Sequence, residues 1–151
     1  VYMQTPYFLP TDAVLFAMRT AALAGVDVRL IVPLRTDALF VDWASRSFVR
    51  ESVAAGVKVY FYKECFIHSK LLVSDDSLSA CGSANIDFRS FDNNFESNAF
   101  IYDRAIALRM KSIFLHDQSL CMDYSQHIRL QHPTFVQRLC ESLVRLFAPL
   151  M

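Results

Sequence analysis

Short apolar runs alternate with longer amphipathic segments through the first part of this 151-residue chain. Residues 1–5, 26–32 and 57–62 are rich in the apolar and β-branched side chains that favour strands. Between them, residues 11–24 and 37–55 carry apolar side chains at helical spacing, and a glycine that can end a helix follows each segment. Because parallel strands need such long connections, the β-α-β-α-β order predicts an α/β fold with a parallel sheet.

The pattern changes after residue 62, where polar turns replace the helical connections. Three further strands are expected, at residues 66–74, 78–81 and 95–102. Two further helices are expected, at residues 103–120 and 134–147. The first two of these strands flank the polar turn at 75–77, which predicts a hairpin. We therefore expect residues 1–151 to form one α/β domain, a layered sandwich with a mixed, largely parallel sheet flanked by helices.

The amino-acid composition indicates which kinds of molecule this chain is expected to bind. The sequence is 54% hydrophobic, more than is usual for a soluble domain, so some apolar surface is expected to face a partner domain, a second copy or a membrane. Lys+Arg and Asp+Glu both number 15, and this zero net charge argues against nucleic acid as a partner. No run of ~18 apolar residues predicts a membrane span. Because Val1 already lies in an apolar run, with no initiator methionine or signal segment, we expect a piece of a longer protein.

Four cysteines and one apolar helical stripe are expected to belong to the interior. No Cys/His spacing is typical of zinc, so Cys65 and the other three cysteines are expected to be buried free thiols of a reducing compartment. Leu139, Leu143 and Leu146 recur at helical spacing and are expected to be core residues, with an interfacial helix as the alternative.

The residue pair His68 and Lys70 predicts an anion site. Alternate residues of a strand share one face, so the two side chains should point the same way. A histidine and a lysine side by side in an apolar strand are costly unless a ligand uses them. Lys70 would supply positive charge, and His68 could act as a nucleophile or proton donor near neutral pH.

The return strand of the hairpin should bring more donors to the same end of the sheet. Gly82 permits a close backbone approach, and Ser83 and Asn85 carry a hydroxyl and an amide. With Lys70 they would surround the oxygens of a phosphoryl group and stabilise developing charge. In the following loop, Glu96 could orient His68 by accepting a hydrogen bond from one imidazole nitrogen.

The run HSKLLVSDDSLSACGSAN, residues 68–85, has a fixed spacing: His, one residue, Lys, four residues, Asp, six residues, then Gly-Ser. This spacing resembles the motif of the phospholipase D superfamily, and within it the C-terminal half of bacterial cardiolipin synthases. Residues 5–10, 22–33 and 85–96 support the resemblance, which covers nearly the whole chain.

The resemblance implies a role for each residue of the motif. The implied catalytic set is His68, Lys70, Asp75 and Glu96, and the implied phosphate ligands are Lys70, Ser83 and Asn85. Asp75 would be the motif acid, more structural than catalytic, and Glu96 would orient His68. The family chemistry needs no cofactor or metal, although Asp75, Asp87 and Glu96 could instead hold a divalent cation. Arg89 could be a substrate ligand or make a salt bridge within its loop.

Members of the superfamily use two such motifs, and this sequence holds one. Its other histidines, His116, His127 and His132, lack lysine and aspartate partners and are expected at the surface. The resemblance therefore implies a missing N-terminal half or a second copy of the chain. The implied reaction is phosphatidyl transfer through a phosphohistidine between phospholipid alcohols such as phosphatidylglycerol, at the bacterial cytoplasmic membrane. The second motif is usually the acid/base, which we expect of His68, with the nucleophile role left open.

Two alternatives to this reaction remain at the level of sequence. One is a phospholipase D-type phosphodiesterase or nuclease completed by homodimerisation, which the single motif favours. The other is a half-domain that folds but does not turn over substrate by itself.

Overall fold

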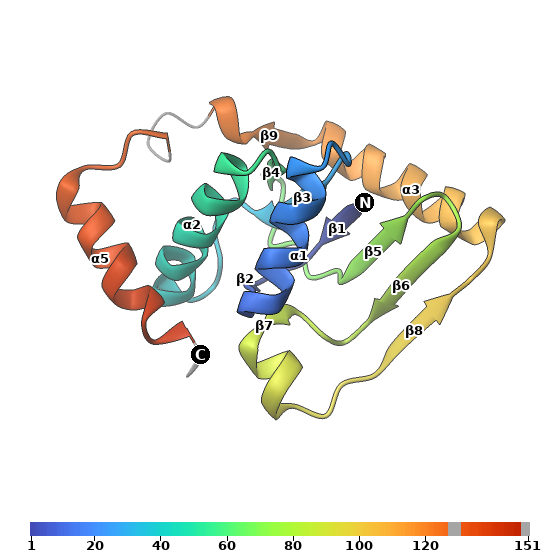
Figure 1. Ribbon diagram of the computed structural model, residues 1–151, viewed down its shortest axis with the longest axis horizontal. Coiled ribbons are helices and arrows are strands. Elements are labelled where there is room, and N and C mark those ends of the chain that lie inside the picture. The colour runs from blue at the N-terminus through green and yellow to red at the C-terminus, as the bar shows by residue number, and fades with distance from the viewer. Residues whose placement is uncertain (127–130, 149–151) are drawn as a thin grey trace.

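The fold is seen in a computed structural model, which describes residues 1–126 and 131–148 (Figure 1). Within these residues, seven strands form one mixed sheet in the order β8-β6-β5-β1-β3-β4-β9. The strands are β1 Tyr2–Gln4, β3 Arg29–Pro33, β4 Lys58–Tyr62, β5 Leu71–Ser74, β6 Leu78–Gly82, β8 Asn98–Ile101 and β9 Cys121–Asp123. A separate short parallel pair joins β2 (Phe8–Leu9) to β7 (Ile86–Asp87).

The predicted mixed sheet is confirmed, although antiparallel pairings outnumber parallel ones in the described seven-stranded sheet, where the expected parallel ladders are confined to the centre. β1 pairs with β3, and β3 with β4, in parallel, as the β-α-β-α-β order requires. β5 adds to the other side of β1 in the antiparallel direction, with Met3 opposite Leu72. The hairpin and β8 continue this antiparallel side, and β9 closes the far edge beside β4.

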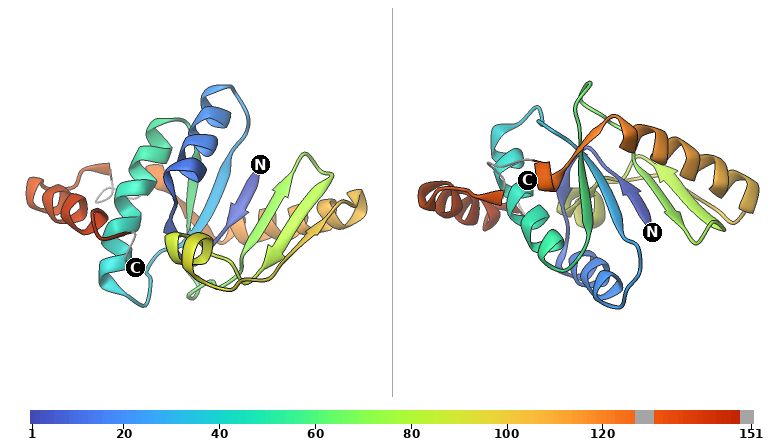
Figure 2. Two further views of the ribbon diagram at one scale, coloured as in Figure 1. Left: turned by 60° about the horizontal axis from the view of Figure 1, so that its bottom comes forward. Right: turned by 90° about the horizontal axis from the view of Figure 1, so that it is seen from above.

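Helices cover the two faces of the central strands (Figure 2). The helices α1 (Asp12–Leu23) and α2 (Leu39–Ala54) pack on one face, and α3 (Arg104–Ser119) packs on the other. The last helix, α5 (Phe135–Arg145), lies outside α2 (Figure 1). The structure is therefore a three-layer sandwich in which α5 adds to the outer layer that α1 and α2 form.

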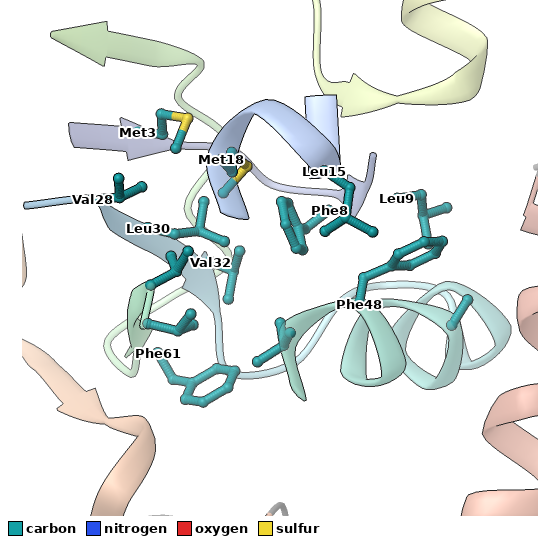
Figure 3. Packing of buried hydrophobic residues seen from close by; sticks show 14 of the residues in the cluster. Met3, Phe8, Leu9, Leu15, Met18, Val28, Leu30, Val32, Phe48 and Phe61 are labelled. Carbon is teal, nitrogen blue, oxygen red and sulfur yellow. The ribbon is translucent and has the colours of Figure 1, made fainter. Parts of the chain in front are cut away.

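Most of the core lies between the sheet and the first two helices (Figure 3). Leu30 and Val32 of β3 meet Leu15 and Met18 of α1 and Phe48 of α2 there. Burying aliphatic and aromatic side chains contributes roughly 1.5–3 kcal/mol for each one, so this layer supplies much of the folding free energy. It also fixes the carboxyl edge of β1, β3 and β4, from which the candidate site is built.

Several element boundaries and burial predictions differ from the structure. β5 begins at Leu71, not at residue 66, and the predicted polar loop contains β7 and a short π-helix, Arg89–Asn93. The cysteines are free, as predicted, but the prediction of burial was wrong, because Cys65 is exposed and the other three are only partly buried. The prediction that Leu139, Leu143 and Leu146 belong to the core was also wrong, because α5 binds α2 through ion pairs and leaves those leucines exposed.

None of the described helices is both long enough and apolar enough to cross a membrane.

Candidate phosphate-binding site

The candidate site lies at the carboxyl edge of the central parallel strands, where β4 ends and β5 begins. His68 and Lys70 lie in the segment between these strands, ahead of the observed β5, although the sequence predicted them within a strand over residues 66–74. Lys70 Nζ lies 2.9 Å from His68 Nδ1 and donates to the His68 carbonyl oxygen at 2.9 Å. The two side chains therefore meet as predicted, although the strand that was expected to align them starts at Leu71.

The charge of Lys70 is balanced between burial and nearby carboxylates. Partial burial lowers the pKa of Lys70 below the ordinary value of a lysine, while Glu96 and Asp87 act in the opposite direction. A phosphate anion next to Lys70 Nζ would favour the protonated form further.

The rings of Phe66 and Tyr7 form a row of aromatic contacts that begins at His68. The ring centroids of His68 and Phe66 are 5.7 Å apart, and those of Phe66 and Tyr7 are also 5.7 Å apart. The Tyr7 hydroxyl donates to Asp37 Oδ1 at 2.8 Å. Burial first, and then the bond to Asp37, raises the pKa of Tyr7 to about 12, so the phenol stays neutral at physiological pH.

Gly82 and Ser83 join the hairpin to the segment that carries Glu96. A Cβ on Gly82 would lie 2.7 Å from Asn98 Cα, so glycine is needed for the close approach of β6 and β8. Ser83 Oγ donates to Glu96 Oε2 and accepts from the Ser97 amide at 3.0 Å. The close approach that the sequence predicted at Gly82 therefore serves strand pairing, and it brings Ser83 and Glu96 together.

Glu96 is held by two polar side chains. It accepts from Ser83 Oγ, and Asn94 Nδ2 donates to its other oxygen at 3.1 Å. These bonds, the Ser83 bond first, lower the pKa of the Glu96 carboxyl, and Lys70 contributes in the same direction. The lowered pKa favours the carboxylate form of Glu96, and its predicted bond to His68 stays a prediction.

Asn85 is fixed by residues that the sequence reasoning did not assign. Its Nδ2 donates to Asp87 Oδ2 at 3.0 Å, and its backbone amide donates to Ser90 Oγ at 3.0 Å. The Ser90 amide donates in turn to Asp87 Oδ1 at 2.7 Å, and both Asp87 and Ser90 are buried. The spacing Asp-x-x-Ser at the start of a short helix is the signal that predicts this carboxylate-to-backbone bond.

The motif acid Asp75 lies away from this cluster. Asp75 and Asp76 have φ values of 51° and 54° and form the turn between β5 and β6. The turn is at the opposite end of β5 from Lys70, roughly 16 Å along an extended chain of five residues. Asp76 also bridges to Lys111 at 2.6 Å. The structure therefore places His68 against Lys70, Ser83 against Glu96, and Lys70 and Asn85 on one pocket. It leaves Asp75 at the far end of β5.

With this geometry in place, the chain was compared with known proteins. The family model described as "Cardiolipin synthase, PLD-like domain", where PLD stands for phospholipase D, matches residues 1–118. The chain belongs to this family. A cardiolipin synthase of Clostridium perfringens is 41% identical over 151 residues, which make up 100% of this chain and 32% of that protein. The major cardiolipin synthase ClsA of Bacillus subtilis is 42% identical, with coverage of 100% and 31%.

Two solved structures share the fold of this chain. The phospholipase D family member Nuc from Salmonella typhimurium has a TM-score of 0.69 at 20% identity, covering 81% of this chain and 79% of that one. The phosphatidylserine synthase of Haemophilus influenzae has a TM-score of 0.76 at 16% identity, with coverage of 99% and 41%. The predicted superfamily and the α/β fold are confirmed, and this phospholipase D-like chain spans about a third of the length of its curated cardiolipin synthase relatives.

The structure also bears on the alternative metal ligands, the remaining histidines and Arg89 of this phospholipase D-like chain. In its described residues, no three His, Cys, Asp or Glu side chains gather as a metal site, and the alternative triad of Asp75, Asp87 and Glu96 is not formed. His116 and His132 are exposed, as predicted, and His127 lies outside the described residues. Among the described residues, none of the ion pairs involves Arg89, so the predicted alternative of a loop salt bridge is not formed.

Proposed function

We propose that this chain supplies one of the two active-site motifs of a phosphatidyltransferase of the cardiolipin synthase type. The observation that carries the proposal is the cluster of His68, Lys70, Ser83 and Asn85 at one edge of the sheet. The cluster occurs in a chain whose family and curated relatives are those of cardiolipin synthases. These relatives are about three times as long as the chain, which leaves room for a second motif in the same protein.

In this proposal the donor phosphate binds next to Lys70. The lysine ammonium and the second N–H of the Asn85 amide donate to its non-bridging oxygens. Ser83 lies next to the phosphate in this proposal, but its one hydroxyl proton is donated to Glu96. Because Asp87 already accepts one N–H from the Asn85 amide, the amide cannot flip without losing that bond. Donors that are fixed before the reaction stabilise the developing charge without reorganising, and one such donor can contribute about 2.7–4 kcal/mol.

The proposed reaction is a double displacement at phosphorus. The histidine of the second motif attacks phosphorus, forming a P–N bond, while the P–O bond to the leaving glycerol breaks. His68, as imidazolium, gives its proton to the leaving alkoxide. The neutral His68 then takes the proton of an incoming alcohol, whose oxygen attacks phosphorus and breaks the P–N bond. No proton or electron is gained or lost over the cycle.

Glu96 has a positioning role in this scheme. The positive charge of Lys70 helps to lower the pKa of its carboxyl, and Lys70 in turn touches the His68 ring. A carboxylate that accepts an imidazole N–H fixes the tautomer and favours the imidazolium. We propose that Glu96 does this for His68, and that Ser83 and Asn94 hold the carboxylate in place.

The proposed substrates are phosphatidylglycerol and a second phospholipid alcohol, taken from a membrane surface. The partner motif is supplied by the remainder of the protein, or by a second copy of the chain. A phosphodiesterase completed by such a second copy is the alternative.

Cardiolipin formation by the full-length protein tests the proposal. His68→Ala should lower the rate by about 10²–10⁴-fold, the contribution of a positioned acid/base group. His116→Ala is the matched control, because His116 is an exposed histidine on α3. Cardiolipin synthesis at the wild-type rate in His68→Ala would refute the proposal.

A further inference from the structure

The helix α5 packs on the rest of the molecule through its polar side, the reverse of the usual arrangement of a surface helix. Glu141, which is buried, pairs with Arg50 of α2. Arg145 pairs with Glu51 at 2.7 Å, and its guanidinium lies 4.2 Å from the centroid of the Phe48 ring. Because these contacts hold the polar side of α5 against α2, the apolar side of the helix points away from it.

The outward side of α5 and the residues just after it form a stripe of exposed apolar side chains. The members of this apolar stripe are 49–80% exposed and are Phe135, Leu139, Leu143, Leu146 and Phe147. Positions 135, 139, 143 and 146 are three or four residues apart, so they lie along one face of the helix. A contiguous exposed apolar surface of this kind marks a binding surface.

The apolar stripe continues onto the start of α2. Glu141 reaches Arg50, and Arg145, one turn later, reaches back to Ser47, so the two helices are antiparallel. The end of α5 therefore lies toward the start of α2, where residues 39–40, a leucine and a phenylalanine, are also exposed (Figure 1). This start follows β3 at the carboxyl edge of the sheet, the edge that carries the candidate site.

Two exposed arginines accompany this apolar surface. Arg138 lies on α5, and Arg35 lies in the loop before α2. None of the ion pairs found among the described residues involves either of them. Their guanidinium groups suit phosphate oxygens. The surface of an anionic membrane offers a phosphate to a cation at any position, whereas a protein partner would need a carboxylate opposite each arginine.

We propose that α5 and the start of α2 form a membrane-docking face, and that its occupant is the surface of a bilayer that contains anionic phospholipid. The choice of a bilayer rests on the proposed function, whose substrates are lipids. α5 has 11 residues, fewer than the ~20 of a helix that spans a bilayer, so it lies in the plane of the interface. In that position the apolar stripe enters the boundary between headgroups and acyl chains, beside the edge of the sheet that binds the lipid phosphate.

Vesicle binding by the chain of residues 1–151 tests the docking face. Trp43 is the only tryptophan of the sequence, and its ring centroid is 6.3 Å from that of Phe40, so its fluorescence reports contact with lipid. Vesicles of equal parts phosphatidylglycerol and phosphatidylcholine should shift the Trp43 emission to shorter wavelength, and brominated phosphatidylcholine should quench it. Combining Leu139→Glu with Leu143→Glu should weaken binding by at least about 10-fold, because two apolar side chains no longer enter the interface.

The arginines test the charge of the occupant. Arg138→Gln should weaken binding to the mixed vesicles by about fivefold, the contribution of one cation near an anionic surface. The same variant should bind vesicles of pure phosphatidylcholine as the wild type does. An equal loss on both kinds of vesicle, or no loss on either, would overturn the role of anionic lipid.

A matched control separates the stripe from the added charge. Combining Leu108→Glu with Ile113→Glu adds the same two charges at exposed apolar residues of α3, on the other face of the sheet, and should keep wild-type binding. Leu39→Glu, at the start of α2, gives the same test if the α5 variant unfolds. Wild-type binding by the α5 variant, an equal loss in the control, or an unshifted Trp43 emission would each overturn the docking face.

Two other results identify a different error. A dimer in light scattering that the α5 variant dissociates, with no vesicle binding by the wild type, would assign the stripe to a second copy of the chain and overturn the proposal. Vesicle binding as expected, but without cardiolipin formation by the full-length protein, would instead overturn the proposed function and leave the docking face in place.

Discussion

At the scale of the residue, the contact between Ser83 and Glu96 links hydrogen bonding to pH. The bond from Ser83 is the first cause of the lowered pKa of Glu96. A carboxyl whose pKa is lower in the folded state contributes stability above its unfolded pKa, and this contribution is lost as pH falls through the folded pKa. If Glu96 positions His68, the acid limb of activity should follow the same titration.

Ser83→Ala should therefore shift the acid limb of kcat/KM to higher pH, because the carboxyl loses its main hydrogen-bond donor and protonates sooner. Ser83→Thr keeps a hydroxyl and should leave the limb where it is. The profile of kcat/KM against pH for the full-length enzyme reports the groups of the free enzyme. An unmoved limb in Ser83→Ala would argue against Glu96 as the positioning carboxylate.

The sequence predicted the site residues whose chemistry is unusual for their surroundings. It did not predict the hydrogen-bond partners that hold those residues in place. His68 and Lys70 were found because two polar side chains are costly in an apolar run. The role of Asp87 and Ser90 in holding Asn85 was missed because their bonds run between a side chain and the backbone of one short loop. Asn85, Asp87 and Ser90 all lie in a segment that the sequence predicted as an irregular loop, where no periodicity identifies the buried side chains.

At the scale of the element, the β5–β6 turn gives Asp75 a role that needs no contact with substrate. Both Asp75 and Asp76 have positive φ, which a non-glycine residue adopts at a cost of about 1–2 kcal/mol and which Asp and Asn tolerate best. The turn sets the register of the hairpin, with Leu71 opposite Cys81, and so sets the position of Lys70. We therefore propose that the motif acid acts through strand pairing.

Asp75→Asn should keep activity within about threefold of wild type, because asparagine tolerates the same φ and a surface change of this kind alters stability by little. Asp75→Val should lower stability by at least about 1 kcal/mol, because a β-branched residue is strained at positive φ. Activity assays and thermal unfolding of the full-length protein check both variants. A loss of 10²-fold or more in a stably folded Asp75→Asn protein would assign a chemical role to this carboxyl.

The helices and central strands were predictable because their periodicity extends over many residues. Gly25 and Gly56, with φ values of 86° and 98°, lie just after α1 and α2 as the sequence indicated. The short strands β2, β7 and β9 were not predicted, because two or three residues carry no periodic signal. Their positions depend on tertiary contacts, such as the bond from the Ile86 amide to the Thr5 hydroxyl at 3.1 Å.

At the scale of the whole molecule, the apolar surplus of the sequence is on the surface. Leu39 and Phe40 at the start of α2 are 74% and 64% exposed, and Leu146 and Phe147 after α5 are 74% and 57% exposed. Figure 1 shows α3 beside one face of β6 and β8, and no other described helix covers these two strands. Phe100, in β8, is 64% exposed. Exposed apolar surface of this extent is typical of chains that bind a partner or a membrane.

The cycle in the proposed function needs two histidines, and this chain brings one to the site. Purified as residues 1–151, the chain should therefore bind inorganic phosphate through Lys70 but show no turnover of a soluble chromogenic phosphodiester as a monomer. Removing one member of a set of groups that act as a unit costs nearly as much as removing the whole set, so the residual rate should be at least about 10⁴-fold below that of the full-length protein.

Light scattering measured on the same sample as the activity distinguishes the two sources of the second motif. An inactive monomer, together with an active full-length protein, assigns the second histidine to the remainder of the protein. A dimer that turns over the diester by itself assigns the second histidine to another copy of the chain, and Lys70→Ala should then abolish that activity. Turnover by a monodisperse monomer would contradict the two-histidine cycle, because His68 cannot hold the phosphoryl group and protonate the leaving alcohol at the same time.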